Sequence, residues 1–126
     1  MVNIQTLGYG GKKSAEFFQE LKAIDPDIII DVRENPDKAF LGCYTRPKLS
    51  EKLGEIYTWI PELGNKSRKM PPTLIDEEEG IRKLLELAKD KERFVLLCSE
   101  KLEERCHRSY VKARFLESLN DPGLDK

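Results

Sequence analysis

The chain has 126 residues; 39% are hydrophobic and 36% are charged, and 22 Lys and Arg residues nearly balance 23 Asp and Glu residues. This length fits one domain, and the recurring apolar residues exclude a chain that stays disordered for lack of a core. No apolar run reaches the roughly 18 residues of a membrane span and no signal peptide is visible, so we expect a cytoplasmic protein without membrane contact. Three unevenly spaced cysteines (Cys43, Cys98 and Cys106) favour free thiols over a disulfide framework.

Short apolar runs alternate with helical stripes along the chain. Residues 4–7 predict a first strand, Ser14 an N-cap for a helix ending at Ile24, and residues 28–32 a strand covered on both faces because consecutive residues are apolar. Pro47 and Gly54 bracket a short helix, and residues 56–60 predict a third strand.

The second half continues this alternation. Three prolines and a basic centre predict an exposed loop at residues 61–73, and the acidic residues 76–79 suit the start of a helix. Residues 94–97 predict a fourth strand, and residues 103–119 a last helix. We therefore expect residues 1–126 to form a single α/β domain, layered, with a mainly parallel four- to five-stranded sheet flanked by helices.

This architecture predicts where a ligand would bind. In open parallel sheets, ligands bind beyond the carboxyl ends of the strands, where the strand-to-helix loops gather. The first such loop contains Gly8, Tyr9 and Gly10, and its backbone N–H groups are candidates for binding an anion, with a simple tight turn as the alternative. The loop departs from both the dinucleotide and the P-loop fingerprints.

Asp31 and Arg33 stand two residues apart at the end of the second predicted strand. Alternation along an extended chain places their side chains on one side, where they would orient a ligand or pair with each other. Tyr57 and Trp59 of the third strand are aromatic residues that could stack on a base, but we expect them to pack in the core.

The fourth loop carries Cys98, Glu100, Cys106, His107 and Arg108. Three chemistries remain open for it. A thiolate nucleophile would use His107 as its partner; a soft metal site would combine the two cysteines with His107; or Arg108 would bind an anion while Glu100 or His107 moves a proton. We expect neither a bound metal nor a cofactor, because the spacing fits no standard metal motif.

Four motifs together resemble a known family. They are Thr6-Leu7-Gly8-Tyr9, Asp31-Val32-Arg33 with Pro36, Leu63-Gly64, and Leu97-Cys98-Ser99-Glu100 with Cys106-His107-Arg108. In this order they are similar to the domain-of-unknown-function family 488, from about residue 4 to 115. The resemblance implies a compact α/β domain in which the motifs cluster, and it implies no established reaction.

Our first hypothesis is a small enzyme, or a descendant of one, that binds an anionic or nucleotide-like ligand at the carboxyl edge of the sheet. In it, Asp31, Glu100 and His107 are the catalytic candidates, Arg33, Arg108, Gly8, Tyr9 and Gly10 bind the ligand, and Cys98 and Cys106 are structural or redox-active thiols. One alternative is a nucleic-acid-binding module without catalysis that uses the basic residues Arg46, Lys48, Lys52, Lys66, Arg68 and Lys69. Another is a metal or redox site of cysteine and histidine. The sequence leaves the substrate, the reaction and the oligomeric state open.

Overall fold

The computed structural model describes residues 2–9, 13–34, 45–65, 73–98 and 107–120. These form a four-stranded parallel sheet with the strand order β1-β4-β2-β3. The strands are β1 (Asn3–Gly8), β2 (Ile28–Asp31), β3 (Tyr57–Trp59) and β4 (Arg93–Cys98). The helices are α1 (Ser14–Ile24), α2 (Arg46–Leu53), α3 (Glu77–Leu87) and α4 (His107–Leu119), with single 3-10 turns η2 (Gly54–Ile56) and η3 (Pro61–Leu63). The predicted α/β class and the parallel sheet are confirmed.

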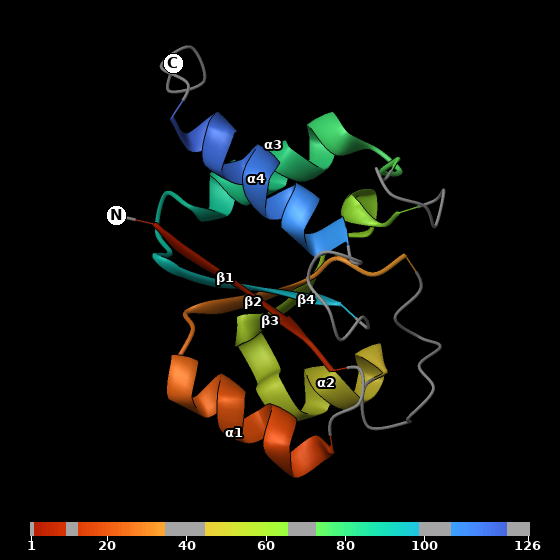
Figure 1. Cartoon of the computed structure of the whole chain (residues 1–126), viewed down its shortest axis with the longest axis vertical. Coiled ribbons are helices and arrows are strands. Elements are labelled where there is room, and N and C mark those ends of the chain that lie inside the picture. Colours follow the sequence, from red (N-terminus) through yellow and green to blue (C-terminus); the bar gives the residue numbers. More distant parts are fainter. Residues whose placement is uncertain (1, 10–12, 35–44, 66–72, 99–106, 121–126) are drawn as a thin grey trace.

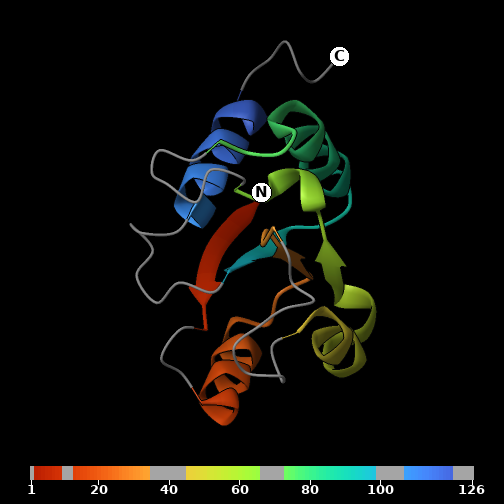
Figure 2. The same cartoon turned by 90° about the vertical axis from the view of Figure 1, so that its right-hand side faces the viewer.

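Helices cover both faces of this sheet (Figure 1). Helices α1 and α2 lie against one face, and α3 and α4 lie against the other, so that the sheet forms the middle of three layers (Figure 2). Because side chains alternate between the two faces of a strand, the buried residues divide into two cores. The α1/α2 core comprises Leu7, Tyr9, Phe17, Leu21, Ile29, Leu49, Tyr57, Val95 and Leu97.

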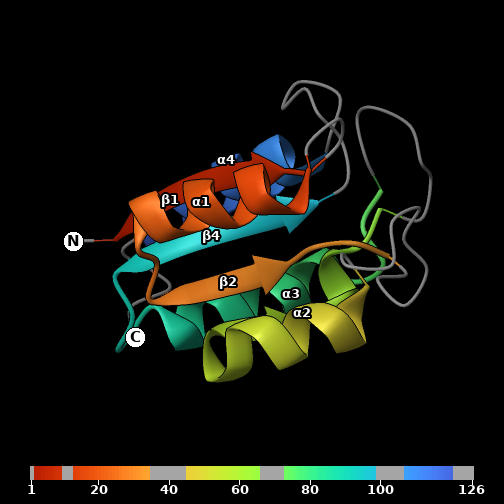
Figure 3. The ribbon, with the colours of Figure 1, turned by 90° about the horizontal axis from the view of Figure 1, so that it is seen from below.

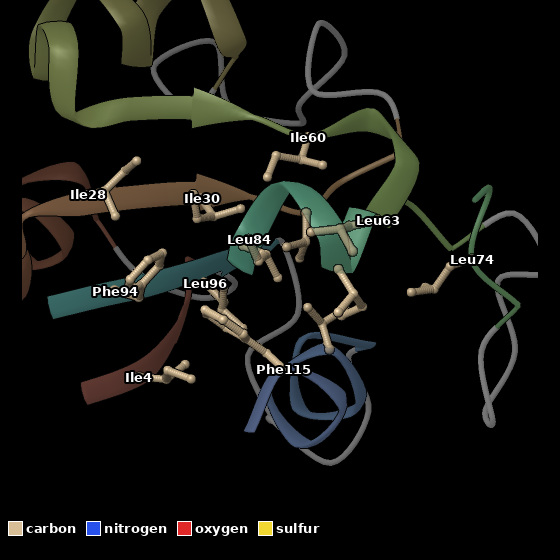
Figure 4. Close-up of a cluster of buried hydrophobic side chains, with 13 residues drawn as sticks. Ile4, Ile28, Ile30, Ile60, Leu63, Leu74, Leu84, Phe94, Leu96 and Phe115 are labelled. Atoms are coloured by element: carbon tan, nitrogen blue, oxygen red, sulfur yellow. The ribbon is translucent and has the colours of Figure 1, made fainter. Parts of the chain in front are cut away.

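The α3/α4 core is the larger of the two (Figure 4). It comprises Ile4, Ile28, Ile30, Val32, Ile60, Leu63, Leu74, Ile81, Leu84, Phe94, Leu96, Val111 and Phe115. Phe94 of β4 and Phe115 of α4 meet edge to face, with ring centroids 5.2 Å apart. This geometry is favourable for aromatic pairs and fixes α4 on the sheet.

The two central strands explain the continuous apolar runs in the sequence. All four residues of β2 are buried, as are residues 94–97 of β4. Since β2 and β4 have a neighbouring strand on each side and a helical layer on each face, no residue of these runs reaches water.

Two details differ from the sequence expectations. Ser14 is the first residue of α1 and does not cap it, because the N-cap position is Lys13, which makes no side-chain capping bond. The segment after β3 is not wholly an exposed loop, since η3 buries Leu63 completely in the α3/α4 core. Residues 66–72 of that expected loop, and residues 103–106 of the last predicted helix, lie outside the described part of the chain.

The carboxyl ends of the strands meet at one edge of the sheet. The arrowheads of β1, β2 and β4 point the same way in Figure 3. The helices that follow β1 and β2 lie on one face, whereas those that follow β3 and β4 lie on the other. Neighbouring strands therefore send their chains to opposite faces, which is the arrangement that favours ligand binding at this edge.

Candidate functional site

Four charged or ionisable side chains are buried among the described residues, and all four lie at the carboxyl edge of the sheet. The exposed fraction is 0% for Asp31, 6% for Arg33, 9% for His107 and 3% for Arg108. Asp31 ends β2 and Arg33 follows it, while His107 and Arg108 begin α4 after β4. Because burying charge is costly without compensating contacts, such a concentration requires a specific network.

Asp31 and Arg33 form a two-pronged ion pair. Arg33 Nε donates to Asp31 Oδ1 at 2.8 Å and Arg33 Nη2 donates to Oδ2 at 2.5 Å. The backbone N–H of Arg33 also donates to Oδ1, at 3.1 Å. The side chains therefore lie on one side of the strand end, as their spacing predicts, and they hold each other in a fixed orientation.

Two tyrosines extend this pair, one from the adjacent strand β3 and one from the end of β1, beyond β4. The hydroxyl of Tyr57 in β3 donates to Asp31 Oδ2, and Arg33 Nη1 donates to the hydroxyl oxygen of Tyr9, just beyond β1, at 3.1 Å. The guanidinium of Arg33 also lies over the Tyr9 ring, 5.4 Å from its centroid. Side chains from the ends of three strands thus form one hydrogen-bonded unit on the α1/α2 side of the sheet.

The electrostatics of this unit favour a charged Arg33 and a neutral Tyr57. Burial lowers the pKa of Arg33, but its hydrogen bond to Asp31 and the charge of that carboxylate outweigh burial and raise the pKa above its usual range. Burial, followed by the charge of Asp31, raises the pKa of the Tyr57 hydroxyl well above its usual range. The Tyr57 hydroxyl therefore keeps its hydrogen at neutral pH and donates it to the carboxylate.

Trp59 lies next to this network in β3. Its residue is the register partner of Asp31, and its indole Nε1–H donates to the backbone carbonyl of Arg33 at 2.9 Å. The ring is half-buried and packs against the α1/α2 core. The guanidinium of Arg46, the first residue of α2, lies over the ring at 5.2 Å from its centroid.

His107 approaches the same strand end from the other face of the sheet. Its Nε2 makes a hydrogen bond with the backbone carbonyl of Val32, the residue between Asp31 and Arg33. Because a carbonyl oxygen only accepts, Nε2 must carry the hydrogen. Burial lowers the pKa of His107, although the carbonyl groups of Val32 and Leu63 oppose that shift. The imidazole is therefore neutral at pH 7.

Residues 72–115 match the family model described as domain of unknown function DUF488. Over these residues, the match supports the resemblance to the DUF488 family that the sequence motifs indicate. It spans α3, β4 and the first part of α4, and so it includes His107 and Arg108. The DUF488 resemblance of the earlier motifs, such as that of residues 31–33, rests on the sequence alone. No curated protein and no solved structure matches the chain.

The structure places the predicted motif residues in two groups around Val32. Asp31, Arg33 and Tyr9 are joined on the α1/α2 side, while His107 and Arg108 lie at the start of α4 on the opposite side. Gly8 ends β1 and is the register partner of Cys98 at the end of β4. The two groups meet at the backbone of Val32, whose carbonyl oxygen makes the hydrogen bond with His107 Nε2.

Several predicted site residues lie outside the described part of the chain. These are Gly10, Glu100 and Cys106, and the side chain of Cys98. Within the described ranges, no group of three or more His, Cys, Asp or Glu side chains is placed to bind a metal ion. A site of Cys98, Cys106 and His107 stays a hypothesis. In the same ranges, no helix is both long and apolar enough to cross a membrane.

Sequence reasoning missed the polar roles of Tyr57 and Trp59. Both were assigned to core packing, and both do pack against the α1/α2 core, but each also donates a hydrogen bond to the Asp31–Arg33 segment. The available signal was their two-residue spacing at a strand end, since such aromatic side chains share one face and carry one polar atom each.

Proposed function

We propose that this protein binds a small anionic ligand at the carboxyl edge of its sheet. The observation that carries the proposal is that polar residues from all four strands gather near this edge. They are Tyr9 after β1, Asp31 and Arg33 at β2, Tyr57 and Trp59 in β3, and His107 and Arg108 after β4. Burying polar groups in such a network costs free energy, because the groups are removed from water. Sheets of this topology bind ligands at this edge.

The proposal divides the buried residues by what their contacts leave them able to do. Asp31 accepts three hydrogen bonds from Arg33 and one from Tyr57, so it serves to position the guanidinium and not to take a proton from a ligand. Arg33 in turn holds Tyr9 at the mouth of the first loop. These three side chains form the rigid floor of the proposed site.

Positive charge comes from the start of α4. Arg108 is the second residue of this helix, and the first turn contains no acidic residue. The partial positive charge of a helix N-terminus adds to that of a guanidinium, so both favour an anion in this position. If the ligand reacts, His107 and Glu100 are the candidates for moving a proton, His107 as a neutral imidazole near pH 7.

Calorimetric titration with inorganic phosphate and with ribose 5-phosphate at low salt tests the proposal. We expect binding by the unaltered protein and at least about a tenfold loss in Arg108→Gln, a loss that Arg108→Lys partly restores. Arg114→Gln is the matched control, because Arg114 lies on the same helix but is exposed and pairs with Glu77 and Glu117. Urea unfolding of each variant separates lost binding from lost folding. Failure of both compounds to bind, or equal losses in the Arg108 and Arg114 variants, contradicts the proposal.

A nucleic-acid-binding role is a second candidate, favoured by the surface of α2. A groove between α1 and α2 is lined by Ser14, Ala15, Phe18, Lys48, Glu51 and Lys52. The ammonium of Lys52 lies 5.4 Å from the centroid of the Phe18 ring, a combination of charge and aromatic surface found in single-strand binding. This role predicts affinity for a single-stranded oligonucleotide that falls steeply with salt and falls further in Lys48→Gln/Lys52→Gln. Salt-independent binding, or none at low salt, contradicts it.

A further inference from the structure

Trp59 is the only tryptophan of the chain and occupies a defined place at the edge of the proposed site. It is the last residue of β3 and lies beside Asp31 in the parallel register of β2 and β3. Paired residues of adjacent strands project to the same face, so the indole stands next to the Asp31–Arg33 network. A large aromatic ring therefore borders the side chains to which we assign ligand binding.

The orientation of this ring is fixed on two sides. Its single donor, Nε1–H, donates to the carbonyl oxygen of Arg33 at 2.9 Å, which favours one orientation of the ring. One part of the indole packs on the α1/α2 core, whereas the ring as a whole remains half-buried. The exposed part of the indole is thus an aromatic surface that is already ordered in the folded protein.

The guanidinium of Arg46 lies over this surface. Its central carbon is 5.2 Å from the centroid of the Trp59 ring. Arg46 is the first residue of α2, and its long side chain is half-buried, so its guanidinium is held beside the indole by the helix. Indole and guanidinium planes are the two protein surfaces on which nucleobases stack.

We infer that the anionic ligand carries a nucleobase, and that this base stacks on the Trp59–Arg46 pair. The inference rests on the proposed function, since it adds a base-binding surface to the same anion site. Arg46 and Trp59 contact the base, Arg108 binds the phosphate, and the Asp31–Arg33 unit between them fixes the indole through the Arg33 carbonyl. The ligand class is then a phosphorylated nucleoside and not a phosphorylated sugar alone.

The experiment compares adenosine monophosphate with ribose 5-phosphate, which has the same phosphate and ribose but no base. Both are titrated calorimetrically, and the fluorescence of Trp59 is followed in parallel, because the chain has no other tryptophan. We expect adenosine monophosphate to bind about tenfold or more tightly and to quench the fluorescence, and ribose 5-phosphate to leave it nearly unchanged.

Variants locate the base. Trp59→Leu should reduce the affinity for adenosine monophosphate to that for ribose 5-phosphate, whereas Trp59→Phe should keep part of the difference. Arg46→Gln, which leaves the core untouched, should also reduce the difference in affinity between adenosine monophosphate and ribose 5-phosphate. Arg82→Gln on α3 is the control for this variant, because Arg82 is exposed and pairs with Glu79. Equal affinity for the two compounds, with both lost in Arg108→Gln, overturns the inference and leaves the proposed function standing. Binding of neither compound overturns both.

Discussion

Removing the charge of Asp31 should be the most destabilising single isosteric change at the carboxyl edge of the sheet. Asp31→Asn keeps the shape of the side chain but leaves the Arg33 guanidinium without its anionic partner. The carboxylate is fully buried and the Arg33 side chain is 7% exposed, so water cannot take the place of the lost charge. Breaking a buried ion pair in this way costs about 3–5 kcal/mol. Since domains are stable by only about 5–15 kcal/mol, this is a large share of the free energy of unfolding.

Urea unfolding followed by Trp59 fluorescence measures the loss. Three companion variants identify its cause. Tyr57→Phe removes one hydrogen bond to the carboxylate and should cost about 1.5–3 kcal/mol. The double variant Asp31→Leu/Arg33→Met removes both charges and should be more stable than Asp31→Asn, because no uncompensated charge stays buried. Glu117→Gln, which breaks an exposed ion pair with Arg114, should change nothing measurable.

The reasoning is refuted by either of two results. One is a loss below about 1 kcal/mol in Asp31→Asn, which would mean that water reaches the guanidinium. The other is a double variant as unstable as Asp31→Asn, which would mean that shape and not charge is what matters at this position.

Three further predictions concern pH, packing and capping. Because the pKa of His107 is lowered in the folded protein, the unfolded chain takes up a proton on this side chain at a higher pH than the folded protein does. The free energy of unfolding should therefore fall as the pH drops below about 6.5, by at most about 1.4 kcal/mol per pH unit. His107→Gln should flatten this dependence, and NMR titration of this single histidine gives its pKa. Gly64→Ala should cost about 1–3 kcal/mol in urea unfolding, because the added Cβ would lie 2.7 Å from the Cα of Glu34. Asp76→Ala should cost about 1 kcal/mol by the same measurement, since its carboxylate accepts the Glu79 N–H at 3.3 Å as the cap of α3.

The fold was predictable because its central strands carry an unambiguous signal. Consecutive apolar residues in 28–30 and 94–97 indicate strands that are covered on both faces, and those strands are the middle pair of the sheet. The acidic residues 76–79 likewise indicated the start of α3, which begins at Glu77. The N-cap of α1 was wrong by one residue, since Ser14 has helical geometry and its hydroxyl makes no capping bond.

The candidate site was only partly predictable. The two-residue spacing of Asp31 and Arg33 was sufficient to place their side chains together. The contacts of His107 were not predictable, because its partners are backbone carbonyl groups, which every residue has. The role of Trp59 depends on the register of β2 and β3, which places it beside Asp31. Sequence periodicity predicts which face of the sheet a side chain lies on, but it does not predict which residue of the adjacent strand lies beside it.

Composition misled the prediction for the segment after β3. Prolines and a glycine indicated a loop, and Leu63 was treated as part of it, yet its side chain is completely buried beneath α3. A single 3-10 turn is too short to produce a periodic pattern, so one core residue in it leaves no sequence signal.

The order of strands in the sheet constrains how the molecule assembles during synthesis. Among the described strands, β1 pairs only with β4, so Asn3 gains its partner only when Arg93 is present. Strands β2 and β3, in contrast, join residues as near in the chain as Ile29 and Tyr57. A nascent chain that has emerged only as far as α3 can pair β2 with β3, but it has no strand to connect them to β1. Closure by such distant contacts is slow, and it leaves the first strand open to other chains in the meantime. The N-terminal strand can therefore join the described sheet only after β4 has been synthesised.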